Sequence, residues 1–198
     1  MNIDKSVCWY DKKTTPDQMI SGAKGDLWPV LKDSDHFPVL KELMSLAAFG
    51  GECCTLLDLG CGAGELSKLC DGYSYVGADL KNIISGVALK LNPKSKFINF
   101  DIYEDDGDFI LDYDLVVVNG FFEILQHPIF ALKKVLQNSS KYVLIHRQTF
   151  FSKNSSGFDA SAGHSTKKFP SYGGTTYQSF LNMEKTINLI LENNFEFV

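Results

Sequence analysis

The chain lacks the features that mark membrane, secreted and nucleic-acid-binding proteins. It contains no run of 18 apolar residues, so no membrane-spanning helix is predicted. Its first residues, MNIDKSVCWYDKK, form no apolar signal core, so we expect a cytoplasmic protein. Basic residues are in the minority, with 19 Lys and Arg against 24 Asp and Glu and a net charge of −5. This balance gives no broad electrostatic reason to bind nucleic acid or an anionic membrane.

Cysteine is scarce and shows no metal-binding pattern. The five cysteines are an odd number, and no Cys or His pairs have the spacing of a zinc site. We therefore predict reduced thiols and no metal centre. No internal repeat is present, and 198 residues with 44% apolar content fit one globular domain.

What the chain does contain is a series of short apolar runs separated by helical patterns. Continuous Val, Ile and Leu runs of this length are typical of strands buried on both faces of a parallel sheet. The runs cover residues 54–59, 75–79, 97–100, 115–118, 142–146 and 195–198. Their alternation with helices predicts a doubly wound, mostly parallel α/β fold with three layers, helix–sheet–helix.

Three helices are indicated most clearly between these runs. Ser34 and Asp35 precede Pro38, which is a helix-start signal, and Gly50-Gly51 should end that helix. Two further stripes are expected to cover a face of the sheet. They comprise Ile129, Leu132 and Leu136 behind Pro128, and Met183, Ile187, Ile190 and Leu191.

The domain boundaries follow from composition. Residues 1–34 are polar and mixed and are interpreted as an N-terminal extension with short irregular structure. Residues 35–198 form the predicted domain. Within it, residues 147–177 show no period and carry Ser, Gly and Lys together with several aromatics. Such a stretch predicts a long loop that is either disordered or a substrate-side binding loop.

The strongest motif is LLDLGCGAGELSKL, at residues 56–69. It predicts a strand, a turn with Gly60, Gly62 and Gly64, and then a helix. Glycine permits positive φ and a close approach to the backbone, and free N–H groups at a helix start favour a polar or anionic ligand. Its place directly after an apolar strand makes the glycine pattern specific.

Two acids at neighbouring strand ends complete a nucleoside-like pattern. Asp79 follows the second strand and can accept hydrogen bonds from both ribose hydroxyls, or else cap the next helix. Asp101 follows the third strand and could accept from an adenine amine while Ile102 packs on the ring. Alternatively, Asp101 is one of several solvated acids in an acidic loop.

These motifs resemble the class I S-adenosylmethionine (SAM)-dependent methyltransferases over roughly residues 35–198. The resemblance rests on LLDLGCGAGELSKL, YVGAD, NFDIYE and YDLVVVNGFFEILQHP. More faintly, the chain resembles methyltransferases associated with surface-polysaccharide genes. It departs from the superfamily in having Ile124 where many members have histidine, and in stopping at an apparent sixth strand, before the usual antiparallel seventh. The chain is therefore truncated or its sheet ends one strand early, and an exposed edge would favour a homodimer.

The resemblance implies SAM as the cofactor, S-adenosylhomocysteine as its product, and a methyl transfer to a small-molecule or glycan acceptor. Nucleic acid is not an expected acceptor, because no Asn-Pro-Pro-aromatic signature follows the fourth strand. The implied cofactor-binding residues are the acids, the turn residues and their neighbours at the strand ends. They are Asp58, Gly60, Cys61, Gly62, Gly64, Asp79, Leu80, Asp101, Ile102, Asn119 and Glu123.

A neutral acceptor must also lose a proton, and histidine titrates in the right range for a base. His146 ends the fifth strand and His127 follows the fourth, so both are candidate catalytic residues. Each could instead be a surface or capping histidine. Two other functions stay open: a catalytically silent SAM-binding or assembly module, and an NAD-type Rossmann protein. The latter is disfavoured because Glu65 stands where G-x-G-x-x-G requires glycine.

Overall fold

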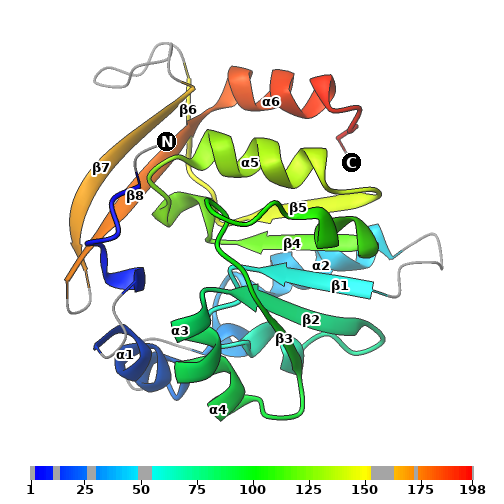
Figure 1. Ribbon diagram of the computed structural model, residues 1–198. Helices are drawn as coiled ribbons and strands as arrows, with labels where there is room; N and C mark the ends of the chain where they lie inside the picture. The colour runs from blue at the N-terminus through cyan, green and yellow to red at the C-terminus, as the bar shows by residue number, and fades with distance from the viewer. Residues whose placement is uncertain are drawn as a thin grey trace.

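The computed structural model describes residues 3–10, 14–25, 30–48, 55–152, 163–171 and 174–197. A parallel sheet of five strands in the order β3-β2-β1-β4-β5 forms its centre (Figure 1). The strands are β1 (Thr55–Leu59), β2 (Ser74–Asp79), β3 (Lys96–Asn99), β4 (Leu115–Asn119) and β5 (Tyr142–His146). The doubly wound α/β prediction is therefore confirmed, and five of the expected strands form within one residue of their predicted bounds.

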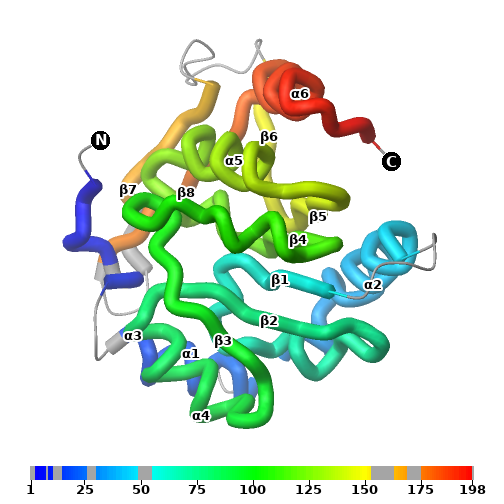
Figure 2. The backbone as a smooth tube through the Cα atoms, turned by 45° about the vertical axis from the view of Figure 1, so that its right-hand side comes forward, coloured from blue at the N-terminus to red at the C-terminus, as the bar shows by residue number. Residues whose placement is uncertain are grey.

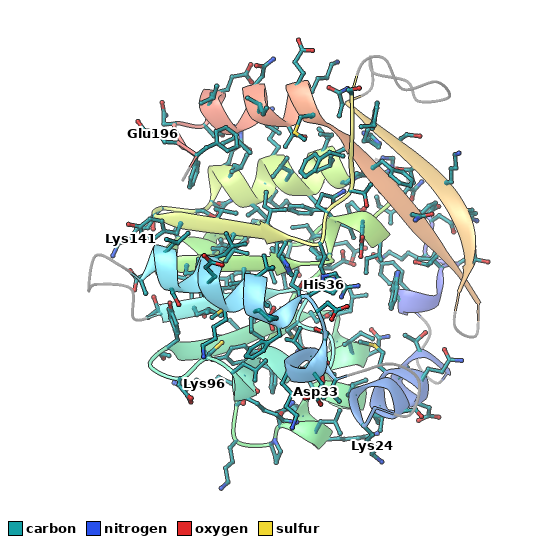
Figure 3. All side chains as sticks on the ribbon, turned by 180° about the vertical axis from the view of Figure 1, so that it is seen from behind. Lys24, Asp33, His36, Lys96, Lys141 and Glu196 are labelled. Carbon is teal, nitrogen blue, oxygen red and sulfur yellow. The ribbon has the colours of Figure 1, made fainter. Side chains whose placement is uncertain are left out.

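Helices cover both faces of this sheet and give the expected three layers. On one face, α2 (Phe37–Ala47) packs through Leu40 and Met44 against Leu56, Leu115 and Val117. Figure 3 shows α2 in front of the sheet. On the other face lies α5 (Pro128–Gln137). Its buried residues, Ala131, Leu132, Val135 and Leu136, pack with the opposite side chains of β1, β2 and β4.

Both proline-led helix starts are observed, although the expected cap of α2 is not. Pro38 and Pro128 lie in the first turn of their helices, where the missing N–H costs nothing. No side chain caps α2, because the Ser34 hydroxyl donates instead to the carbonyl of Leu31 at 2.7 Å. Gly50-Gly51, the expected end of this helix, lies outside the described residues.

The prediction of a long loop at residues 147–177 is wrong for the residues that the structure describes, because they form most of a second sheet. This sheet has the order β6-β8-β7 and contains β6 (Phe150–Phe151), β7 (His164–Ser171) and β8 (Gly174–Asn182). β7 and β8 pair as an antiparallel hairpin at the carboxyl edge of the main sheet (Figure 1). The buried residues of β8 include Tyr177 and Ser179. Buried positions in this strand are therefore not consistently apolar, and the sequence shows no alternating pattern. Residues 153–162 and 172–173 lie outside the described part.

Two expectations for the C-terminal region are also wrong. The predicted sixth strand does not form at residues 195–197, which have no regular structure, and Val198 lies outside the description. α6 (Met183–Glu192) forms, but its stripe is not buried: Met183, Ile187 and Leu191 are 44%, 36% and 53% exposed. The reason is that α6 stacks on α5 rather than on the sheet, and therefore packs through Leu189 and Ile190 (Figure 1).

The N-terminal extension is more ordered than expected and includes a ten-residue helix, α1 (Thr14–Ala23). The first residues of the chain run beside β7 and β8, and α1 lies next to α3 and α4 (Figure 2). The remaining helices are η1 (Cys8–Tyr10), α1 (Thr14–Ala23), η2 (Leu31–Asp33), η3 (Glu65–Lys68), α3 (Lys81–Ile83), η4 (Ile84–Ala88), α4 (Leu89–Leu91), η5 (Asp108–Asp112) and η6 (Phe122–Ile124). Within the described ranges, none of the helices has the length and apolarity needed to cross a membrane.

Gly77, in the middle of β2, should be intolerant of any side chain. A Cβ there would lie 2.7 Å from the Phe97 ring and 2.8 Å from the Cys61 sulfur. We expect Gly77→Ala to lower the free energy of unfolding by about 1–3 kcal/mol, the usual cost of overpacking a core. Urea unfolding would measure this. The loss should be smaller when Gly77→Ala is introduced into a Phe97→Leu background, and an equal loss in both backgrounds would contradict the proposed clash.

Candidate functional site

The turn after β1 bends as the glycine motif predicts. Gly60, Gly62 and Gly64 have φ values of +74°, +53° and +72°, in the left-handed region that side chains disfavour. Protein side chains also approach this backbone closely. A Cβ at Gly60 would lie 2.4 Å from the Phe121 ring, and one at Gly62 would lie 3.0 Å from the Met19 methyl. Both close approaches require glycine.

Asp79 ties this turn to the end of β2. Its carboxylate accepts the N–H of Gly62 at 2.8 Å and the N–H of Leu80 at 2.7 Å. Burial raises the pKa of Asp79 to about 6, although both hydrogen bonds act to lower it. Each carboxylate oxygen can accept a further hydrogen bond, so the group remains available to a pair of hydroxyls.

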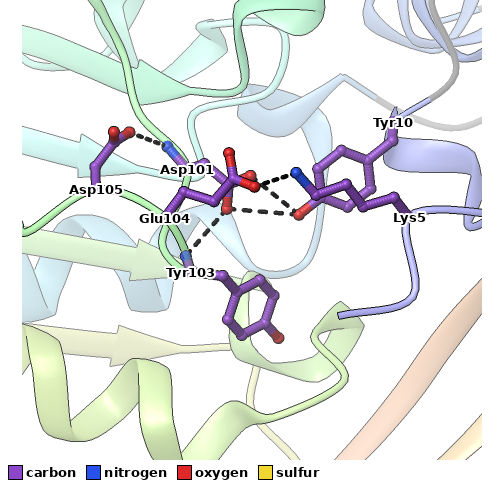
Figure 4. A network of polar contacts seen from close by, with 6 residues as sticks. All are labelled: Lys5, Tyr10, Asp101, Tyr103, Glu104 and Asp105. Atoms are coloured by element: carbon purple, nitrogen blue, oxygen red, sulfur yellow. Dashed lines mark hydrogen bonds and ion pairs between the residues drawn. The ribbon is translucent and has the colours of Figure 1, made fainter. Parts of the chain in front are cut away.

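Asp101, at the end of the third strand, belongs to a network that includes the N-terminal segment (Figure 4). Its carboxylate accepts the N–H of Tyr103 at 3.0 Å and the hydroxyl of Tyr10 at 3.2 Å. Beside it, the Lys5 ammonium pairs with Glu104. Burial raises the pKa of Tyr10, and the Asp101 charge adds to this effect. Asp101 is therefore anchored rather than freely solvated.

These groups line a pocket of about 270 Å³ at the carboxyl edge of the main sheet. This volume lies near the lower end of the range for small-molecule sites. Eight of the eleven predicted cofactor-binding residues line it. They are Gly60, Gly62, Asp79, Leu80, Asp101, Ile102, Asn119 and Glu123.

The other three predicted cofactor residues, Asp58, Cys61 and Gly64, do not line the pocket. Asp58 is 4% exposed and accepts a hydrogen bond from the Tyr75 hydroxyl at 2.9 Å. Burial raises its pKa to about 7. Cys61 is buried in a cluster with Ile84 and Ala88, and a side chain at Gly64 would meet Phe97. These positions support the turn from inside the protein.

Neither predicted catalytic histidine lines the pocket. His146 Nδ1 lies 3.0 Å from the Asn119 amide oxygen, and its ring contacts that of His36, labelled in Figure 3. Burial lowers the pKa of His146, and the His36 and Arg147 charges act in the same direction. The Nε2 atom of His127 is buried and has no hydrogen-bond partner among the described residues, and its ring lies against those of Tyr103 and His164. Neither imidazole therefore belongs to the described lining of the pocket.

The N-terminal segment supplies part of the pocket wall that the sequence did not predict. Its contributions are Ile3, Asp4, Val7, Trp9 and Tyr10, with Met19 from α1. The segment is bound to the second sheet by polar contacts. The indole N–H of Trp9 donates to the Thr176 hydroxyl at 2.6 Å, and Asp4 pairs with Lys168 at 2.6 Å. The only sequence signal was the presence of Trp9 and Tyr10 in an otherwise polar stretch.

Charge in the pocket is mostly negative. Asp4, Asp79, Asp101 and Glu123 line it, and Arg147 is the one cationic side chain among the described lining residues. An apolar, acid-lined hollow favours a ligand that carries positive charge, because the surrounding low dielectric strengthens the attraction.

Comparison with protein families matches residues 28–191 to a family described as methyltransferase domain. The chain belongs to this family. The predicted membership of the class I SAM-dependent methyltransferase superfamily is therefore confirmed. The N-terminal residues that line the pocket, Ile3 to Tyr10 and Met19, lie outside the part that matches the methyltransferase domain. No curated protein matched the chain.

Solved methyltransferase structures share the fold at low sequence identity. The N-terminal domain of EvdMO1, crystallised with S-adenosylhomocysteine, has a TM-score of 0.54 and 14% identity, over 81% of this chain and 74% of that one. DesVI of Streptomyces venezuelae has a TM-score of 0.53 and 14% identity, over 82% and 84%. CalS10, a SAM-bound amino pentose methyltransferase from Micromonospora echinaspora, has a TM-score of 0.56 and 12% identity, over 82% and 84%.

The raised pKa of Asp58 predicts a pH-dependent stability. A carboxyl group whose pKa is higher in the folded state contributes stability that is complete below its unfolded value of 3.8 and is lost as the pH rises towards 7. Asp58→Asn cannot ionise, so its free energy of unfolding should fall less between pH 5 and pH 8 than that of the wild type. Urea unfolding at both pH values tests this. Asp71→Asn, at an exposed position, should retain the wild-type pH dependence, and an Asp58→Asn slope equal to wild type would refute the assignment.

Proposed function

We propose that this chain binds SAM and transfers its methyl group to a small-molecule or glycan acceptor. The observation that carries the proposal is the shared pocket of the glycine turn, Asp79 and Asp101. Two carboxylates lie at successive strand ends, beside a glycine turn that has no room for a Cβ at Gly60. They offer acceptors for ribose hydroxyls and for an adenine amine.

The residues present also fit the charge of SAM. The sulfonium cation would enter a pocket with four carboxylates and a largely apolar wall, where it is attracted without being strongly hydrated. When bound, SAM supplies the electrophilic methyl group. The protein then has to hold the acceptor in line with the methyl group and exclude water.

The pocket supports a small acceptor rather than a polynucleotide. Acids outnumber cations on its wall, so the phosphate groups of a polynucleotide would be repelled. The aromatic rings of Trp9, Tyr10 and Tyr177 also line the pocket and provide flat apolar surfaces. One relative by fold, CalS10, is an amino pentose methyltransferase, which is consistent with a sugar acceptor.

A second candidate function is a SAM-binding module without turnover. It is favoured by the position of His146 and His127 outside the pocket, which leaves the deprotonation of an acceptor unassigned. Incubation with labelled SAM and an extract of the source cell distinguishes the two. Transfer of label to a small molecule that depends on the protein supports the methyltransferase, and label retained on SAM alone supports the module.

We expect micromolar binding of S-adenosylhomocysteine, measured by isothermal titration calorimetry. Asp79→Asn should weaken this binding by about 10- to 100-fold, because hydrogen bonds to a charged group contribute about 1.5–3 kcal/mol. Asp71→Asn removes an equal charge from the surface and should bind as wild type does.

Thermal unfolding would check that Asp79→Asn is folded. An unchanged affinity in the folded variant would remove the ribose assignment. An absence of heat with both SAM and S-adenosylhomocysteine would remove the proposed function itself. Displacement of S-adenosylhomocysteine by NADH would support the NAD-type alternative instead.

A further inference from the structure

Arg147 is the single cationic side chain that lines the described part of the pocket, against four acids. A ligand with a carboxylate group therefore has one partner of opposite charge available there. Guanidinium also suits this task by shape, because its N–H groups form a fork that matches the two oxygens of a carboxylate.

The backbone at Arg147 is in a conformation that few residues other than glycine adopt. Its φ is +57°, immediately after the last residue of β5. Non-glycine residues in this region are uncommon, and they cluster at sites where the conformation has a function. Gly120, after β4, is also left-handed, and its N–H donates to the carbonyl of His146 at 2.9 Å. The ends of β4 and β5 are thus held together.

Gly120 leaves room for a pair of charged groups above these strand ends. A Cβ at Gly120 would lie 3.3 Å from the Glu123 carboxylate and 3.7 Å from the Arg147 guanidinium. The two groups face each other at 3.9 Å from Nη2 to Oε1, which is too long for a hydrogen bond. Neither makes a side-chain hydrogen bond to another described residue, and their side chains are 44% and 29% exposed. The pair is therefore loosely engaged and open to the pocket.

The order of the strands places this pair at one end of the proposed ligand. Along the sheet, Asp101 follows β3, Asp79 ends β2, the glycine turn follows β1, and Glu123 and Arg147 follow β4 and β5. With adenine at Asp101 and ribose at Asp79, the sulfur lies over the glycine turn. The amino-acid end then extends towards β4 and β5, and it carries one ammonium and one carboxylate.

We propose that Glu123 and Arg147 together bind the zwitterionic amino-acid end of SAM. Arg147 donates to the ligand carboxylate and Glu123 accepts from the ligand ammonium, and these contacts replace the loose pair. The inference rests on the proposed function and adds a residue, Arg147, and a pairing of charges to it. Glu123 is thereby assigned to the donor end of the pocket.

The test is calorimetric binding of three ligands whose charged groups at this end differ, with each affinity compared between the variant and the wild type. S-adenosylhomocysteine has both charged groups, decarboxylated SAM has the ammonium alone, and 5′-methylthioadenosine has neither. Arg147→Asn is the variant of choice, because asparagine tolerates a left-handed backbone better than most residues. We expect it to weaken S-adenosylhomocysteine by about 10- to 100-fold and to leave the other two affinities unchanged.

Glu123→Gln should show a different pattern, which separates the two roles. It should weaken both S-adenosylhomocysteine and decarboxylated SAM, since each presents the ammonium, and leave 5′-methylthioadenosine unchanged. The control is Lys133→Gln, which removes an equal charge from an exposed position on α5 and should bind all three ligands as wild type does.

Three results would overturn the inference. Unchanged S-adenosylhomocysteine binding by Arg147→Asn would show that the guanidinium serves another anion, such as one on the acceptor. Equal weakening of 5′-methylthioadenosine in a variant that unfolds at the wild-type temperature would show a general effect on the pocket. If Arg147→Asn and Glu123→Gln weakened the same ligands by the same factor, the separate roles given to the two side chains would be contradicted. In each of these cases the proposed function still holds if the wild type binds S-adenosylhomocysteine. If the wild type does not bind S-adenosylhomocysteine, the proposed function itself is contradicted.

Discussion

The hydrogen bond from the Gly62 N–H to the Asp79 carboxylate is the contact around which the pocket is organised. It joins the turn after β1 to the end of β2 at 2.8 Å and so fixes two neighbouring strand ends as one surface. The bond is possible because three left-handed glycines bend the chain back within a few residues. Burial of the carboxylate opposes its ionisation and raises its pKa to about 6. Further donors, such as ligand hydroxyls, would therefore stabilise the charged form.

The opposite wall of the pocket depends on contacts between segments that are far apart in sequence. Trp9 bonds to Thr176, Asp4 pairs with Lys168, and Tyr10 bonds to Asp101. Through these bonds the N-terminal segment connects the second sheet to Asp101, which follows β3 in the main sheet. The match to the methyltransferase family begins at residue 28, so this wall lies outside the matched part. Variation in this segment would change this wall of the pocket and leave the strand ends intact.

Prediction succeeded where local pattern and burial agree. Runs such as LVVV at residues 115–118 are buried on both faces, so their apolar character alone indicates a central strand. It failed where packing depends on partners. In β8 the buried Ser179 hydroxyl donates to the carbonyl of Leu125. A polar residue therefore occupies an inward position, and the strand lacks the alternation of apolar and polar residues that would have revealed it. On α6 the error is the reverse: Met183 and Leu191 are apolar and were expected to be buried, but they are exposed because α6 packs on α5 through other residues.

The candidate site divides in the same way. The sequence alone determined the glycine turn, Asp79 and Asp101, because parallel strands bring their carboxyl ends to one edge and the residues that follow them must meet there. It could not determine that His146 and His127 lie outside the lining of the pocket, or that Asp58 is buried against Tyr75. Those outcomes depend on the direction of each side chain within the packed layers. Only the tertiary structure decided that Arg147 and Glu123 meet above Gly120, because their approach requires two strand ends and two left-handed residues at once.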